Sequence, residues 1–91
     1  MAFVKENNRI TYVQNGEMLA EITFPAFGED GNVVNIDHTF VNDVLRGQGV
    51  AGTLMEQTVE LLRQDGRKAV ATCSYAQKWF EKHPEAKDVL R

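Results

Sequence analysis

The chain has 91 residues, of which 43% are hydrophobic and 25% charged, as expected for one soluble domain with a single core. A lone cysteine excludes an internal disulfide, and no apolar run approaches the roughly 20 residues of a membrane span. Ten lysines and arginines against 13 aspartates and glutamates give a net charge of −3, which disfavours nucleic-acid binding through a basic face.

The N-terminus predicts no secretory route. Lys5 and Glu6 stand where a signal peptide would need an apolar run, and the free thiol of Cys73 suits a reducing compartment. We therefore expect a cytoplasmic protein with no membrane partner. Because no repeat or linker interrupts the sequence, we expect one domain over residues 1–91.

The first half of the chain favours strands. β-prone runs are separated by turn signals at Asn7-Asn8 and Asn15-Gly16, and Pro25 ends the third run. We predict strands over residues 2–6, 9–13, 18–24 and 33–41, with a loop at 26–32 that carries two glycines and two acids.

The second half changes to helical spacing. Apolar residues recur at helical intervals over 50–64, and Gly66 is a typical stop signal. A short strand is predicted over 68–73. Ser74 and Gln77 have the spacing of a capping box, which predicts a second helix over 74–82 that Pro84 ends. Antiparallel strands followed by a strand–helix–strand crossover indicate an α+β fold.

The glycine-rich segment between the fourth strand and the first helix is the densest chemical signal. Gly47, Gly49 and Gly52 let a ligand approach the backbone, the helix start offers unpaired N–H groups to a pyrophosphate, and Arg46 adds a cation. The alternative is a tight structural turn. The segment is neither a Walker A loop nor a dinucleotide fingerprint, because no Gly-Lys-Ser/Thr follows and the strands before it are antiparallel.

Two further residues are candidates for chemistry. Cys73 ends a strand before a helix, where a thiol can become nucleophilic, although it can equally be a small buried side chain. On the predicted strand, His38 shares the face of Val34, Ile36 and Phe40, so it is either a core residue or, where that face opens or a bulge intervenes, a general base. A hydrolase built on Cys73 and His38 lacks any sign of an oxyanion hole.

Other polar and aromatic residues predict structural roles. His83 lies at a helix end, where a capping or solvent role is expected, and Trp79 and Phe80 read as core residues. The two histidines and the cysteine do not have metal-ligand spacing, so no metal is expected.

In this order of elements the sequence resembles the GNAT superfamily of acetyl-CoA-dependent N-acyltransferases, and within it a short, single-domain branch. The resemblance covers about residues 33–84 and rests on two segments and the strands around them. They are Arg46-Gly47-Gln48-Gly49-Val50-Ala51, which fits the motif Arg/Gln-x-x-Gly-x-Gly/Ala, and Ala76-Gln77-Lys78-Trp79-Phe80-Glu81-Lys82.

The resemblance implies acetyl-CoA as cosubstrate and an amine, either a small molecule or a peptide, as acceptor. The pantetheine arm would pair with backbone near Val41, and the thioester would point toward Cys73. The pyrophosphate would lie on the backbone of Arg46, Gly47, Gln48, Gly49, Val50, Ala51 and Gly52. His38 would take a proton from the amine, Tyr75 or Cys73 would protonate the leaving thiolate, and an acetyl-cysteine on Cys73 ranks behind direct transfer.

The sequence also departs from the family pattern. Phe80 stands where the family often has a general-acid tyrosine, and Cys73 where it often has an asparagine. The family's last two strands and the helices that wall its acceptor site have no counterpart, which predicts a minimal fold truncated at the C-terminus. Two alternatives follow: a CoA-binding or acyl-CoA-binding module without efficient catalysis, and a homodimer that completes the pocket.

Overall fold

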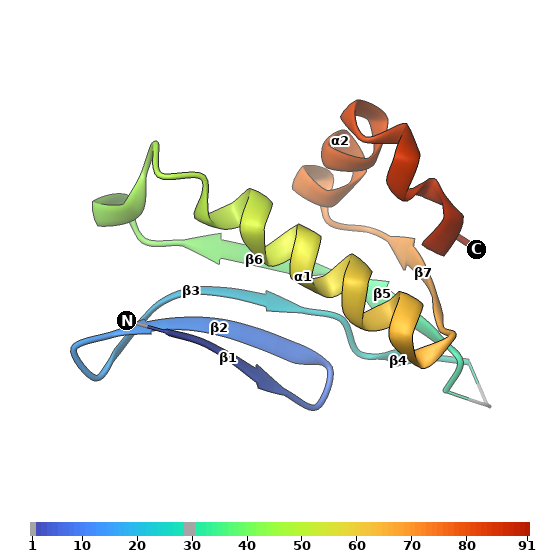
Figure 1. Ribbon diagram of the computed structural model, residues 1–91, viewed down its shortest axis with the longest axis horizontal. Coiled ribbons are helices and arrows are strands. Elements are labelled where there is room, and N and C mark those ends of the chain that lie inside the picture. The colour runs from blue at the N-terminus through green and yellow to red at the C-terminus, as the bar shows by residue number, and fades with distance from the viewer. Residues whose placement is uncertain (1, 29–30) are drawn as a thin grey trace.

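The computed structural model describes residues 2–28 and 31–91 and shows a mixed α+β domain (Figure 1). A meander begins the chain, formed by β1 (Ala2–Glu6), β2 (Arg9–Gln14) and β3 (Glu17–Thr23). The turns between them have left-handed residues, among them Asn15 and Gly16 at φ 53° and 78°, as two-residue hairpin turns require. The three strands predicted for this region are confirmed.

The strands form two sheets. The first has the order β1-β2-β3-β6, all antiparallel, where β6 is His38–Val41. The second has the order β4-β5-β7, formed by Ala26–Phe27, Val33–Ile36 and Lys68–Ala71, and its β5 and β7 run parallel. The strand predicted over 33–41 is thus two strands that belong to different sheets.

The chain divides at Asp37. Its carboxylate accepts a 2.6 Å hydrogen bond from the Thr23 hydroxyl, and its N–H donates to the Thr23 carbonyl at 3.3 Å. On the other side, the N–H groups of Thr72 and Cys73 both donate to the Ile36 carbonyl, at 3.2 and 3.1 Å. β6 pairs with β3, whereas β5 pairs with β7. As a result, β6 and the chain that follows β7 diverge from one another beyond Asp37. The outer edge of β6 has no strand partner among the described residues.

One long helix covers both sheets on the same face. Helix α1 (Val50–Asp65) contacts β2, β3 and β6 of the first sheet and β7 of the second (Figure 1). It ends at Gly66, whose φ of 69° is the left-handed conformation of a glycine C-cap, as predicted. Its inward side chains close the core with the sheets; the fully buried ones in this core include Ile10, Ile22, Phe24, Ile36, Leu54, Met55 and Leu62.

Helix α2 (Ser74–Lys82) has the predicted bounds but not the predicted cap. The Gln77 N–H donates to the Cys73 carbonyl, so Cys73 is the N-cap and Ser74 already lies inside the helix. The Gln77 side chain instead donates to the Ala71 carbonyl at 2.9 Å. The capping-box prediction is therefore wrong, because β7 ends at Ala71, before the predicted end of that strand, and Cys73 rather than Ser74 takes the N-cap position.

Three short elements were not predicted. They are η1 (Asp43–Leu45), η2 (Pro84–Val89) and strand β4 within the predicted loop, whose two acids Glu29 and Asp30 lie outside the described residues. Pro84 ends α2 as predicted, but the chain continues as a 3-10 helix that packs on α1 and α2. At its end Leu90 forms a parallel bridge with Ala69, which covers part of the free edge of β7.

Candidate functional site

The glycine-rich loop is held by local hydrogen bonds. The Asn42 side chain accepts from the Val44 N–H at 3.0 Å and so caps η1, and the chain then turns through Gly47 at φ 84°. Arg46 forms a 2.7 Å ion pair with Asp43, but 81% and 83% of these two side chains are exposed. An exposed pair of this kind is weak, so Arg46 is free to turn to an anion.

The positive end of the α1 helix dipole is not neutralised by a capping side chain or by an acidic residue. Its N-cap is Gly49 at φ 74°, which provides no side-chain hydrogen bond, and its first turn contains no acidic residue. The N–H groups of this turn therefore remain open to a ligand at the positive end of the helix dipole.

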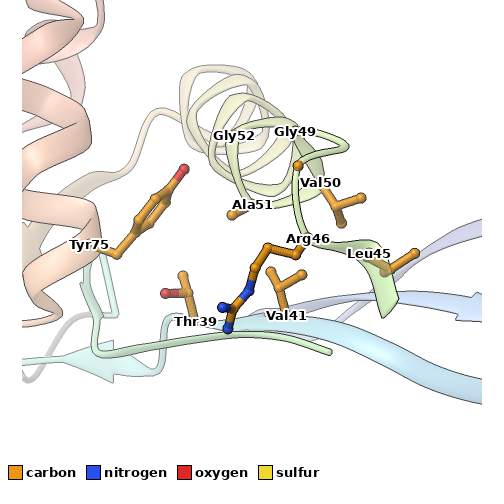
Figure 2. A pocket seen from close by; sticks show the side chains of 10 residues that line it. Thr39, Val41, Leu45, Arg46, Gly49, Val50, Ala51, Gly52 and Tyr75 are labelled. Atoms are coloured by element: carbon orange, nitrogen blue, oxygen red, sulfur yellow. The ribbon is translucent and has the colours of Figure 1, made fainter. Parts of the chain in front are cut away.

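These N–H groups face a cleft of about 350 Å³. Figure 2 shows Thr39 and Val41 of β6 below it, Tyr75 of α2 on one side, and the start of α1 opposite. The cleft lies where β6 parts from the chain that follows β7, so the division at Asp37 is what opens it.

The packing of the described residues does not require a glycine at position 52. It lies in the helix with an ordinary negative φ, and a Cβ there would come no closer than 4.0 Å to the Tyr75 hydroxyl. Glycine in a helix costs about 1 kcal/mol relative to alanine. Neither backbone strain nor packing explains this glycine, whereas a ligand that approaches the helix backbone would.

Tyr75 lines the cleft and Cys73 lies next to Thr39, and the pKa values of the two residues are shifted in opposite directions. Burial raises the pKa of the Cys73 thiol, but hydrogen bonds from the Thr39 hydroxyl, at 3.4 Å, and from backbone at Ala76, Tyr75 and Thr39 outweigh it, so the net pKa is lowered. Burial, and then the negative charge of Cys73, raise the pKa of the Tyr75 hydroxyl. Cys73 is therefore suited to be a nucleophile, and Tyr75 a proton donor.

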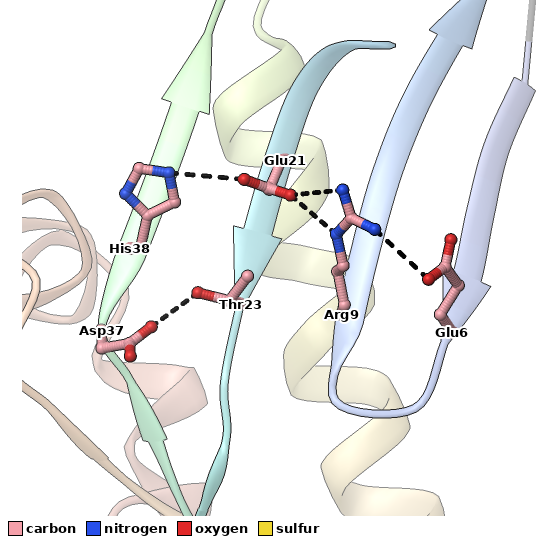
Figure 3. Close-up of polar contacts among 6 residues, drawn as sticks. All are labelled: Glu6, Arg9, Glu21, Thr23, Asp37 and His38. Carbon is pink, nitrogen blue, oxygen red and sulfur yellow. Dashed lines mark hydrogen bonds and ion pairs between the residues drawn. The ribbon is translucent and has the colours of Figure 1, made fainter.

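His38 lies on the opposite face of β6 from the cleft. Its side chain is 53% exposed, and Nε2 is 3.5 Å from Oε1 of Glu21 (Figure 3). The other Glu21 oxygen is bound by Arg9 at 2.6 and 2.7 Å. The expectation that His38 shares a face with the buried Val34 and Ile36 is wrong, because the break at Asp37 shifts the alternation by one residue.

The structure brings most of the predicted ligand-binding residues together. Those that line the cleft are Val41, Arg46, Gly47, Gly49, Val50, Ala51, Gly52 and Tyr75. Gln48 does not line it, since its side-chain amide turns toward the Val44 carbonyl at 3.5 Å. Cys73 is half-buried behind Thr39.

Sequence reasoning missed Thr39 and Leu45 as lining residues. Thr39 alternates with Val41 on the strand, so the same two-residue spacing could have selected it. Leu45 gave no signal, because its place depends on the 3-10 turn of η1.

The described residues, 2–28 and 31–91, hold no group of three histidine, cysteine, aspartate or glutamate side chains that could bind a metal. Within the same residues, none of the helices has the length and apolar character to cross a membrane.

Residues 9–89 match the family model of the GCN5-related N-acetyl-transferases. The chain therefore belongs to the family of GCN5-related N-acetyltransferases, as its glycine loop and second helix indicated.

Solved structures agree with this assignment. A GCN5-like protein from Staphylococcus aureus is 36% identical, with a TM-score of 0.78 over 99% of this chain and 87% of that chain. The ribosomal-protein-S18-alanine N-acetyltransferase from Escherichia coli has a TM-score of 0.65 over 88% of this chain and 50% of that one. At 16% identity it is similar in fold alone.

Vertebrate relatives match a shorter stretch. The protein NATD1 of Gallus gallus is 35% identical over 52 residues, which are 57% of this chain and 47% of that protein. NATD1 of Homo sapiens has the same identity over the same length, 46% of that protein. The matched stretch thus spans about half the length of these curated relatives.

Proposed function

We propose that the cleft binds acetyl-CoA and that the protein transfers its acetyl group to an amine. The observation that carries the proposal is the start of α1, with a left-handed glycine cap, no acid in its first turn, and an unexplained open space at Gly52. A pyrophosphate is the ligand that such a helix start binds best, with Arg46 at its rim.

The residues of the cleft fit the rest of the cosubstrate. The pantetheine arm would run along the unpaired edge of β6 beside Thr39 and Val41, where backbone groups of an edge strand can hydrogen-bond an amide chain. This path leads toward Tyr75 and Cys73, which would bring the thioester to the two residues of altered pKa.

Tyr75 is proposed as the general acid. Because its pKa is raised, its hydroxyl stays protonated and can give a proton to the CoA thiolate as that group leaves. Tyr75 would then do the work that the family often assigns to a tyrosine at the position of Phe80.

His38 is proposed as the base. An acceptor amine must lose a proton to attack a thioester, and His38 lies on the face of β6 that no described element covers. The acceptor would approach from this face, and Glu21 would hold the imidazole through Nε2.

Direct transfer from CoA to the amine is the proposed route, and an acetyl-cysteine is the second candidate. In the latter, the Cys73 thiolate would attack the thioester carbon, CoA would leave with a proton from Tyr75, and the amine would then displace Cys73. The lowered pKa of Cys73 favours this route, while its position behind Thr39 favours direct transfer.

A calorimetric titration with CoA and acetyl-CoA tests the binding. We expect saturable binding by the unaltered protein and its loss in Gly52→Leu, whose side chain fills the open space without requiring a positive φ. Phe27→Leu changes an exposed side chain outside the cleft and serves as the control. No binding by the unaltered protein up to about a millimolar dissociation constant would overturn the proposal.

Mass spectrometry separates the two routes. After incubation with acetyl-CoA and no amine, an acetyl group on Cys73, absent in Cys73→Ala, supports the covalent route. An unmodified protein whose Cys73→Ala variant keeps near-normal turnover supports direct transfer.

A binding module without efficient catalysis is the second candidate function. The uncovered face of β6, where the family's acceptor walls have no counterpart among the described residues, favours it. Saturable CoA binding with no transfer to panels of peptides, polyamines and amino acids would support the module. A homodimer and a cytoplasmic location stay predictions, the first of them testable by light scattering.

A further inference from the structure

A small cavity lies at the C-terminal end of α1, the end opposite the glycine loop (Figure 1). We call it the distal cavity. Its volume is about 170 Å³, and it shares no lining residue with the cleft. Its charged lining residues are Arg63, Arg67, Lys68 and Asp88, so three cations stand against one carboxylate in a chain whose net charge is −3.

Arg67 is fixed in the wall of the distal cavity. Its backbone N–H donates to the Leu62 carbonyl at 2.9 Å, the hydrogen bond that follows a glycine-ended helix. Its Nη2 donates to the Asn8 side-chain oxygen at 2.9 Å, and Asn8 is itself held by a 3.0 Å bond from the Phe24 N–H to its carbonyl. Only 18% of the Arg67 side chain is exposed.

The Nε atom of Arg67 is a buried donor without an acceptor. Within residues 2–28 and 31–91 no atom accepts a hydrogen bond from it. The ion-pair partner of this guanidinium is Asp65, whose Oδ2 is 3.9 Å from Nη1, which is too long for a hydrogen bond. Because a buried donor is costly when it has no partner, the orphaned Nε indicates that an acceptor occupies the cavity that Arg67 lines.

The charge of the distal cavity indicates what kind of acceptor this is. Both Asp88 carboxylate oxygens are bound by Arg63, at 2.7 and 3.0 Å, so the acid in the lining is already compensated. The Lys68 ammonium donates to the Asp88 backbone carbonyl at 2.5 Å, and that group is neutral. Arg67 and Lys68 thus bring two positive charges with no carboxylate at hydrogen-bond distance among the described residues. Two such charges match a doubly charged anion better than a water or a single carboxylate.

We propose that the distal cavity binds a phosphate group, with Arg67 and Lys68 as the residues that recognise it. Guanidinium and ammonium groups are the side chains that bind phosphate oxygens in proteins. The cavity exceeds the roughly 30 Å³ that one water takes up, so it has room for an oxyanion. The inference is independent of the proposed function, because the cavity and the cleft lie at opposite ends of α1.

An NMR titration with sodium phosphate tests the site, with sodium chloride at the same ionic strength as the reference. The Nε–H of an arginine gives its own resonance, so the orphaned donor is observed directly. We expect the Arg67 Nε–H signal and the Gly66 and Lys68 amide signals to shift saturably, with half-saturation at about a millimolar phosphate. Chloride should not reproduce these shifts.

Two lysine variants separate a specific site from general charge. Lys68→Gln removes one recognising cation from an exposed position and should weaken phosphate binding at least about fivefold. Lys87→Gln is the matched control, because it removes the same charge from an exposed lysine of η2 that does not line the distal cavity. It should change the affinity less than about twofold. Arg67→Gln should abolish the saturable response, and Lys68→Gln keeps the test decisive if Arg67→Gln does not fold.

Glycerol 3-phosphate, as a second probe, distinguishes the source of the phosphate. If both probes bind, the site recognises the phosphate group whatever carries it, and if inorganic phosphate alone binds, the site takes the free anion.

Three results would overturn the proposal. An Arg67 Nε–H signal that responds to phosphate no more than to chloride would mean that water fills the cavity. Shifts confined to Gly47 and Gly49 would place the phosphate in the cleft. Equal losses in Lys68→Gln and Lys87→Gln would reduce the effect to general screening.

Discussion

Gly52 occupies the third position of α1, where alanine would suit the helix better. We expect Gly52→Ala to raise the free energy of unfolding by about 0.5–1 kcal/mol, since alanine loses less backbone entropy. The same methyl group enters the open space of the cleft, so affinity for CoA should fall several-fold. Urea unfolding and calorimetry measure the two effects.

The control for this change is Gly66→Ala. Because Gly66 has a φ of 69°, alanine is strained there and should lower stability by about 1 kcal/mol without affecting affinity. A stabilised Gly52→Ala that binds CoA normally would show that no ligand uses the space.

The Thr39 hydroxyl contributes to the lowered pKa of Cys73. Thr39→Val removes the hydroxyl that stabilises the thiolate while keeping the side chain's shape, so the pKa of Cys73 should rise. The rate of iodoacetamide alkylation against pH measures this: its midpoint should move to higher pH, and the rate at neutral pH should fall several-fold.

Thr72→Val is the neighbouring control, because the Thr72 hydroxyl donates to Asn35 rather than to Cys73. It should leave the midpoint in place. Equal shifts in both variants would assign the reactivity to general packing and not to the Thr39 hydroxyl.

At the level of elements, a charged pair links η2 to α1. Arg63 binds both Asp88 oxygens, at 2.7 and 3.0 Å, and donates to the Glu85 carbonyl at 3.1 Å. The hydrogen bond from Arg63 lowers the pKa of Asp88. The carboxylate therefore stabilises the fold above its unfolded pKa, and this contribution is lost as the pH falls through the folded one.

Asp88→Asn tests this linkage. At neutral pH the variant should unfold at a lower urea concentration than the unaltered protein, and the two midpoints should converge as the pH falls toward about 2. Glu81→Gln, an exposed residue of α2, should follow the unaltered protein throughout. A constant difference for Asp88→Asn at every pH would contradict a role for the charge.

The sequence predicted the elements whose causes are local. Asn15-Gly16 determines a hairpin turn, and Gly66 ends α1, because a left-handed backbone is required at these positions. The division at Asp37 could not be predicted, since it results from pairing with β3 on one side and with β7 on the other. His38 was assigned to the wrong face for the same reason.

The residues of the candidate site also divide into those that local sequence predicts and those that depend on the tertiary fold. The glycines and Arg46 lie in one continuous segment, so their spacing was sufficient to predict them as a group. The place of Tyr75 in the cleft needs α2 to lie against α1, and no pattern along one helix contains that information.

In the whole molecule, the walls of the cleft come from segments far apart in the chain. The pairing of Val33 with Lys68 must form across the entire α1 crossover before the two sheets adjoin, whereas the β1-β2-β3 meander closes through turns of neighbouring residues. Because closing long loops is slow, the meander should fold early and the cleft last.

This order has a kinetic consequence for any ligand of the finished cleft. Such a ligand has nothing complete to bind in the folding transition state, so its stabilisation should appear in the unfolding rate. In stopped-flow experiments, saturating CoA should slow unfolding in proportion to its concentration over the dissociation constant and leave refolding unchanged. Faster refolding would mean that the glycine loop binds CoA before the sheets join. If unfolding slows and refolding is unchanged, the cosubstrate prolongs the lifetime of the native state without shortening the time needed to reach it.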